Sequence, residues 1–311
     1  MVFDQATGEM VLLDPSGSGT WTWDGVHAWS QRRSASAPAT IPGKVGGPVP
    51  AMAWDPITRS VLAVVGDMPR PGDLVPTVAP PATWSWQSGA WTRLDSVHTP
   101  DVVSGVMFSF PPARQLILFS GCCDVVQKPA NSSYPFKNAA KPGMWAWDGH
   151  DWSEVHPAHL PPARWGATVA YSSELNEAVM YGGQAISPEP PPLTDTWSWN
   201  GTDWRQVASP KVPGDFVVST AAAARGQVVL TAGGQSFTKG TASSDNQTWV
   251  WGGTAWVKLD VPTPSCFYCE LAYDPVRRLT VLVSDTDGRP NATDEVWTWD
   301  GARWSIRSLP A

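Results

Sequence analysis

The stretch Trp297-Thr298-Trp299-Asp300-Gly301-Ala302-Arg303-Trp304 decides the fold, because the chain contains six versions of it. Each version reads Trp-x-Trp, then a turn with glycine, then a third Trp. The versions begin at Trp21, Trp84, Trp145, Trp197, Trp249 and Trp297, and they close at Trp29, Trp91, Trp152, Trp204, Trp256 and Trp304. Of the 20 tryptophans, only Trp54 and Trp165 lie outside this motif.

The motif predicts a β-hairpin with an aromatic face. Side chains alternate along a strand, so Trp-x-Trp places two rings on the same side. Dipeptides such as Asn200-Gly201 adopt the positive backbone dihedrals that a tight hairpin turn needs. The third Trp then lies on the returning strand. The six turns carry Asp24-Gly25, Ser88-Gly89, Asp148-Gly149, Asn200-Gly201, Gly252-Gly253 and Asp300-Gly301.

A second hairpin precedes each motif, so the repeating unit has four strands. In the fourth unit it reads Ala170-Tyr171-Ser172, a polar turn, and then Ala178 to Gly183. The first Trp recurs after 63, 61, 52, 52 and 48 residues. A unit of this size cannot bury its aromatic face alone, whereas a ring of such units buries each face against the next.

We therefore predict an all-β fold: one six-bladed β-propeller over residues 1–311, with four antiparallel strands in each blade. The expected blades are approximately 1–33, 51–95, 104–156, 164–208, 219–259 and 269–307.

At these residues the chain resembles the kelch and galactose-oxidase-like propeller repeat. The matching features are Gly182-Gly183 and Gly233-Gly234 after the second strands, together with the aromatic of the third strand and the Trp of the fourth. The double glycine is degraded or lost in the other four units. The resemblance implies a propeller fold but says little about function, because this architecture hosts enzymes, lectins and protein-binding modules.

Strand direction predicts two different faces. We call one the long-loop face; it carries the second-to-third loops and the connectors between blades. The other, the turn face, carries the first-to-second turns and the glycine turns of the Trp motif. The segments expected on the long-loop face are 66–82, 121–143, 184–195, 235–247 and the connectors 34–50, 95–104, 155–165, 207–218 and 259–269. Long variable loops on a rigid ring are where binding residues usually lie.

Composition excludes some partners. The net charge is −7, and no cluster of Lys or Arg stands out, which argues against nucleic acid. No run approaches the roughly 20 apolar residues of a membrane span. Only 16% of residues are charged. We expect a monomer that binds a protein or glycan ligand and needs no cofactor.

The four cysteines form two pairs, Cys122-Cys123 and Cys266-x-x-Cys269. Both pairs fall on the long-loop face, in blades on opposite sides of the ring. Disulfides within each pair, free buried thiols and a zinc site of four thiolates are all compatible with the spacing. We predict that any disulfides lie within pairs. An even cysteine count in a loop-rich chain favours an extracytoplasmic or secreted location. The chain opens without a signal peptide, and its first strand begins so early that we expect the natural protein to continue upstream.

Catalytic chemistry has little support in the sequence. The histidines are His27, His98, His150, His156 and His159. His156-x-x-His159 could supply two metal ligands, but no fixed carboxylate partner is visible, so solvated loops are favoured. The copper chemistry of galactose oxidase needs a Tyr and His ligand set that the chain does not show. We therefore predict no catalytic residue and no metal site, and we lean against an enzyme.

The candidate binding residues lie on the axial rim of the long-loop face, at the ends of second strands and the starts of first strands. They are Asp67, Arg164, Trp165, Gln184, Gln235, Phe267, Tyr268 and Asp285. Trp165 attracts interest because it lies outside the repeated motif.

Three functions remain open. The first is a non-enzymatic propeller that binds a protein or an extended ligand through the long-loop face. The second is a carbohydrate-binding propeller, in which exposed tryptophans would stack on sugars; core packing of the motif rings is the competing interpretation. The third is a metal-dependent enzyme with an axial site.

Overall fold

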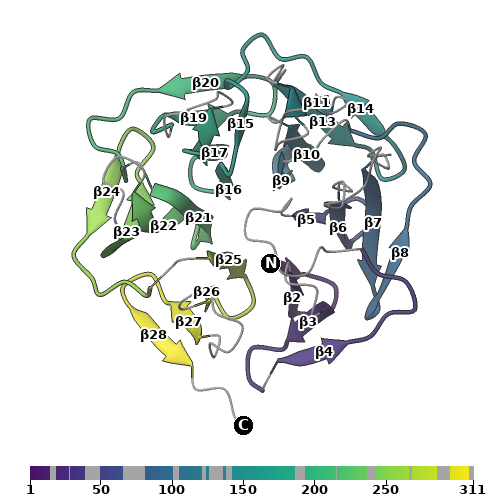
Figure 1. The fold of residues 1–311 in the computed structure, drawn as a ribbon, viewed down its shortest axis with the longest axis horizontal. Helices are drawn as coiled ribbons and strands as arrows, with labels where there is room; N and C mark the ends of the chain where they lie inside the picture. The colour runs from purple at the N-terminus through teal and green to yellow at the C-terminus, as the bar shows by residue number, and fades with distance from the viewer. Residues whose placement is uncertain are drawn as a thin grey trace, which may run out of the picture.

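Six four-stranded antiparallel sheets surround one axis in the computed structural model of the chain (Figure 1). The structure describes residues 1–14, 19–27, 29–38, 50–65, 81–100, 105–120, 124–125, 136–137, 142–185, 193–214, 216–236, 242–265, 268–285 and 295–307. Inner strands line the centre of the ring, and outer strands run around its perimeter (Figure 1). The predicted all-β, six-bladed propeller is confirmed.

The strands of the first three blades follow chain order. Blade one contains β1 (Val2–Asp4), β2 (Glu9–Asp14), β3 (Gly19–Trp23) and β4 (Ser30–Arg32). Blade two contains β5 (Ala51–Asp55), β6 (Ser60–Val65), β7 (Ala82–Gln87) and β8 (Ala90–Arg93). Blade three contains β9 (Gly105–Phe110), β10 (Gln115–Ser120), β13 (Gly143–Trp147) and β14 (Trp152–Glu154).

The other three blades repeat the pattern. Blade four contains β16 (Thr168–Ser172), β17 (Glu177–Tyr181), β19 (Thr196–Trp199) and β20 (Trp204–Val207). Blade five contains β21 (Phe216–Ala224), β22 (Gln227–Ser236), β23 (Ala242–Trp251) and β24 (Trp256–Leu259). Blade six contains β25 (Tyr268–Asp274), β26 (Leu279–Asp285), β27 (Glu295–Trp299) and β28 (Trp304–Arg307).

Two short strand pairs are added to this repeat. One joins β11 (Asp124–Val125) to β12 (Phe136–Lys137) in the loop of blade three, and the other joins β15 (Arg164–Trp165) to β18 (Gln184–Ala185) in blade four. Within the described residues the only helical element is the 3₁₀ turn η1 (Pro111–Ala113).

Six hydrophobic cores lie between neighbouring blades, one at each junction. Between blades four and five, Trp251 and Trp256 of blade five pack with Val179 and Tyr181 of blade four. The same arrangement recurs around the ring. The second and third Trp of a motif also contact each other; in blade five their ring centroids are 5.2 Å apart. Burial of each large ring contributes roughly 2–3 kcal/mol, so the motif stabilises the junctions.

A repeated hydrogen bond joins the closing Trp of one blade to the preceding blade. Its acceptor is the hydroxyl of the threonine just before the first Trp of that preceding motif. The four such bonds are Trp91–Thr20 at 2.7 Å, Trp152–Thr83 at 2.8 Å, Trp256–Thr196 at 2.9 Å and Trp304–Thr248 at 2.9 Å. At the junction of blades three and four, Trp204 Nε1 instead donates to the sulfur of Met144 at 3.3 Å.

The junction of blades six and one is built differently. As at the other junctions, each blade supplies its own four described strands, so the difference lies in the side chains. Val296 stands where the other motifs carry Thr or Met, and the buried Nε1 of Trp29 has no hydrogen-bond partner within the described part of the chain. Arg277 of blade six joins the two blades instead, because its guanidinium donates to the carbonyl oxygens of Asp24 and Gly8.

Because of this difference, two substitutions between Thr and Val should change the stability of the fold in opposite directions. Thr248→Val should cost about 1–3 kcal/mol, because it leaves the buried Trp304 indole without an acceptor. Val296→Thr should instead stabilise the ring by about 1 kcal/mol by giving Trp29 an acceptor. Urea unfolding of both variants measures this. Destabilisation of similar size in both would contradict the proposed equivalence of the two positions.

Candidate functional site

The structure places six of the eight predicted rim residues and brings four of them together in two cross-strand pairs. Trp165 lies opposite Gln184 in the β15–β18 pair, and Tyr268 lies opposite Asp285 in blade six. Gln235 lies opposite Ala242, near the end of β22. Asp67 and Phe267 lie outside the described residues.

Arg164 is built into blade four. It is 2% exposed, and its guanidinium binds both carboxylate oxygens of Asp195, with Nη1–Oδ1 at 2.6 Å and Nη2–Oδ2 at 2.9 Å. Nη1 also donates to the carbonyl of Gly182 at 2.9 Å, and Nε donates to that of Pro162 at 3.0 Å. Arg164 therefore joins the entry of the first strand to both ends of the second-to-third loop.

Asp195 is the residue that completes this clamp. Burial acts to raise its pKa, but the hydrogen bonds and charge of Arg164 outweigh burial, so the pKa lies below its usual value. Trp197 Nε1 also donates to Asp195 Oδ2 at 2.7 Å. The sequence did not single out Asp195. A signal was present, because Gln247 and Glu295 stand two residues before the first Trp of their motifs and accept its indole N–H in the same way.

Gln184 is the other described rim side chain. It is 4% exposed, and its Nε2 has no hydrogen-bond partner among the residues that the structure describes. A buried amide without a partner costs stability, so a native structure that keeps one calls for an explanation. It follows Gly182 and Gly183, whose φ values of 71° and 91° explain the double glycine at this strand end.

The motif tryptophans are core residues and not sugar-stacking platforms. The second and third rings of blades two to five are all at most 2% exposed. The first rings are buried or half-buried.

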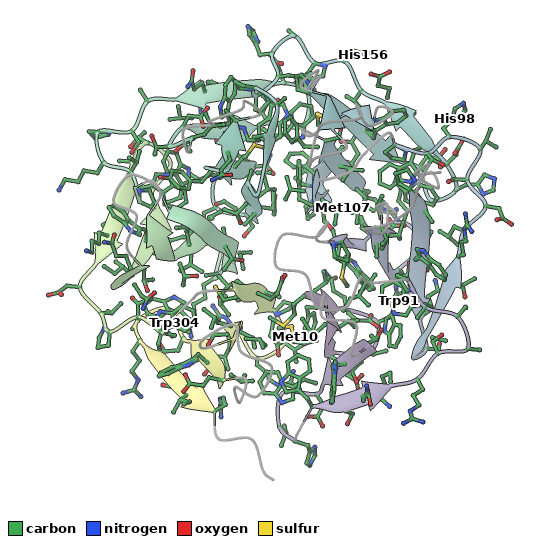
Figure 2. The ribbon with its side chains drawn as sticks, viewed as in Figure 1. Met10, Trp91, His98, Met107, His156 and Trp304 are labelled. Atoms are coloured by element: carbon green, nitrogen blue, oxygen red, sulfur yellow. The ribbon has the colours of Figure 1, made fainter. Side chains whose placement is uncertain are left out.

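Four histidines, His27, His98, His156 and His159, have carboxylate partners that the sequence did not reveal, although their side chains stay exposed as expected. Two of them pair with the following blade. His98 Nδ1 lies 2.7 Å from Asp151 Oδ2, and His159 Nδ1 lies 2.7 Å from Asp203 Oδ2. The backbone N–H of each of these two histidines also donates to the same aspartate. The outer strands follow the perimeter, so a connector meets the outer hairpin of the next blade; Figure 2 shows His98 and His156 at this outer rim. These pairs tie adjacent blades together away from the axis.

The pairs predict a pH dependence. The hydrogen bonds from the backbone N–H and ring of His98 lower the pKa of Asp151 to about 2. A lowered folded-state pKa stabilises the fold above the unfolded value of about 4, and this stabilisation is lost as the pH falls toward 2. Asp151→Asn should therefore melt below the wild type at neutral pH and converge with it in acid. A constant gap in melting temperature across that range would contradict this assignment.

Cys269 is buried and disulfide-bonded. Its partner is one of Cys122, Cys123 and Cys266, which all lie outside the described residues. Pairing within each cysteine pair stays a prediction. Among the described residues, no three His, Cys, Asp or Glu side chains form a group that could hold a metal ion.

Neither of two small hollows among the described residues is lined by a predicted rim residue. One, of about 210 Å³, lies between blades one and two beside Glu9, Arg32 and Trp86, and the other, of about 150 Å³, lies beside Arg93. Both are smaller than the roughly 300–1,000 Å³ of typical small-molecule sites. The described part of the rim is therefore a surface beneath which the Arg164–Asp195 ion pair is buried.

No family model matches the chain, and no curated protein matches it either. None of the described helices is long and apolar enough to span a membrane.

Proposed function

We propose that the protein is a non-enzymatic, kelch-like binding propeller that recognises a protein or an extended ligand through its long-loop face. The observation that carries this proposal is the difference between the two faces. The long-loop face bears structure added to the four-stranded repeat, namely the β11–β12 and β15–β18 pairs. Additions to a rigid ring are suited to recognition, because the ring holds them in fixed relative positions.

The turn face is tightly packed by comparison. There the first-to-second turn of one blade lies against the glycine turn of the next; Phe110 touches Gly201 and Leu175 touches Gly253. These contacts stabilise the ring, so the loops of the opposite face are not needed for this purpose and can differ in length and sequence.

The Arg164–Asp195 clamp supports the same assignment. A buried ion pair gains little net stability, because removing two charges from water offsets their attraction. Its benefit here is a fixed conformation at the base of the loop between Gly182 and Asp195.

An extracytoplasmic, monomeric protein fits this proposal. The disulfide of Cys269 supports it, since disulfides persist in oxidising compartments.

The test uses paired Ala→Arg variants on the two faces. Ala82→Arg/Ala185→Arg adds bulk and charge at the rim of blades two and four, and Ala6→Arg/Ala302→Arg makes the same change on the turn face. Ligands are first selected with the wild-type protein from a displayed peptide library and a glycan array.

We expect the rim variant to lose more than about tenfold in affinity, since a misplaced charge at an interface costs well over 1 kcal/mol. The turn-face variant should bind like the wild type. Loss only in the turn-face variant would refute the proposal. Exclusively glycan ligands would favour the carbohydrate-binding alternative, and stoichiometric metal in the purified protein would favour an enzyme.

A further inference from the structure

The first-to-second turns of the turn face contain an unusual repetition. In every blade, at least one residue of this turn has a positive φ: 75° at Gly8, 55° at Arg59, 50° at Arg114, 57° at Asn176, 50° at Arg225 and 58° at Arg278. In blade five the next residue, Gly226, also has a positive φ, of 96°. Glycine and asparagine adopt this conformation readily, but a long side chain is strained in it. Four of the six blades nevertheless carry arginine.

The turn itself does not require arginine. Blades one and four make the same turn with Gly8 and Asn176, which are the residues that the geometry favours. Backbone strain that a sequence could readily avoid points to a function of the side chain. The shared property of the four strained side chains is a guanidinium group.

These guanidiniums are free to bind an external group. All four arginines are exposed, and none forms an ion pair with a described residue. The one hydrogen bond among their described side chains joins Arg114 Nη2 to the carbonyl of Pro56, at 3.5 Å. By contrast, Arg277, the neighbour of Arg278, already donates hydrogen bonds to Asp274 and to two backbone carbonyls of blade one.

Three aspartates of this face are directed into the protein, whereas Asp24 and Glu174 stay in contact with solvent. Asp4, Asp55 and Asp274 are at most 2% exposed and accept backbone N–H groups of their own turns. Asp148 and Asp300 also accept such N–H groups, although they remain more exposed. Backbone hydrogen bonds from Arg303 and Ala302 lower the pKa of Asp300, and the charges of Arg303 and of the nearby Arg225 lower it further.

Exposed aliphatic side chains accompany the arginines. Val276 and Val26 are each 70% exposed, and Ile57 is 38% exposed. They occupy turns of blades six, one and two, three consecutive blades of the ring. Basic side chains beside exposed apolar ones are also the combination by which amphipathic helices lie in a bilayer interface.

We propose that the turn face docks on a lipid surface with anionic head groups. The arginines belong to blades two and three on one side of the axis and to blades five and six on the other (Figure 1). A plane reaches all four together, whereas a linear polymer would have to cross the axis. Guanidiniums bind phosphate in a bidentate manner, and the valines enter the interface between head groups and acyl chains. This orientation presents the long-loop face to the solvent.

The test combines binding and stability in one variant. Arg59→Gly/Arg114→Gly/Arg225→Gly/Arg278→Gly removes four charges and also relieves four strained backbones. The matched control removes four exposed arginines of the outer rim: Arg33→Gln/Arg93→Gln/Arg205→Gln/Arg307→Gln. The probes are phosphatidylcholine vesicles with and without phosphatidylglycerol, in a sedimentation assay over a salt series.

We expect the wild type to bind only the anionic vesicles, and less tightly as salt increases. Each surface arginine should contribute about fivefold, so the turn-face variant should lose more than about a hundredfold, and the rim control much less. The turn-face variant should melt at the same or a higher temperature than the wild type.

Four results would overturn the proposal: wild-type binding to neither kind of vesicle, equal binding to both, equal losses in the two variants, or a lower melting temperature of the turn-face variant, which would give the arginines a structural role. Binding to soluble heparin without vesicle binding would identify an anionic polymer and also reject it. The proposal concerns the turn face, so a result on ligand binding at the long-loop face neither supports nor rejects it.

Discussion

Gly201→Val is expected to destabilise the protein by about 3 kcal/mol. Two effects add. The φ of Gly201 is 102°, where a residue with a Cβ is strained by roughly 1–2 kcal/mol. A Cβ at this position would also lie 2.7 Å from the Phe110 ring of the preceding blade, and such overpacking costs roughly 1–3 kcal/mol.

Two control variants separate these effects in urea unfolding. Gly89→Val introduces the same side chain at a φ of 82°, where a Cβ meets nothing within 4 Å, so it should show the backbone cost alone. Thr202→Ala removes only an exposed hydrogen bond to Asn200 and should change stability by less than about 0.5 kcal/mol. Equal unfolding midpoints for Gly201→Val and Thr202→Ala would refute the turn assignment, and equal losses at Gly201 and Gly89 would refute the contact with Phe110.

Arg164→Met is expected to cost about 3 kcal/mol, because it leaves the mostly buried carboxylate of Asp195 without its partner. Two carbonyl oxygens, of Pro162 and Gly182, lose donors at the same time. Arg164→Lys should recover little of the loss, since an ammonium cannot reproduce the two parallel bonds to a carboxylate.

The matched control is Arg164→Met/Asp195→Leu, which removes both charges and should be more stable than Arg164→Met alone. The effect should also depend on pH in a defined direction. The folded-state pKa of Asp195 is lowered, so the ion pair stabilises the protein above about pH 4 and loses this effect as the carboxylate is protonated in acid. A single variant as stable as the wild type at neutral pH, or a double variant no better than the single, would contradict the clamp.

The repetition of Trp-x-Trp made the blades predictable, because alternation and turn chemistry are local properties that six copies reinforce. The partners of side chains at the junctions were not predictable in the same way. His98 meets Asp151 only because the twisted outer strands bring a connector to the following blade, 53 residues along the chain. The different junction at Val296 likewise requires knowing which threonine faces which tryptophan.

The sequence predicted where the rim residues lie better than it predicted what their side chains do. Sequence position alone placed Arg164, Trp165 and Gln184 at the end of blade four, and the structure pairs β15 with β18 there. The sequence did not indicate that Asp195, 31 residues after Arg164, binds its guanidinium inside the blade. The charge of an arginine and its position on a strand do not show whether it binds a ligand or holds a loop in place. The burial of its side chain and its hydrogen-bond partners show this.

In this structure the closing tryptophans hold each blade to the one before it. Hydrogen exchange of the indole N–H groups, followed by NMR, tests it most directly. We expect slow exchange for Trp91, Trp152, Trp256 and Trp304, whose indoles bond to threonines of the neighbouring blade. We expect faster exchange for Trp29, whose indole has no acceptor among the described residues. Rapid exchange of all five indoles would contradict it.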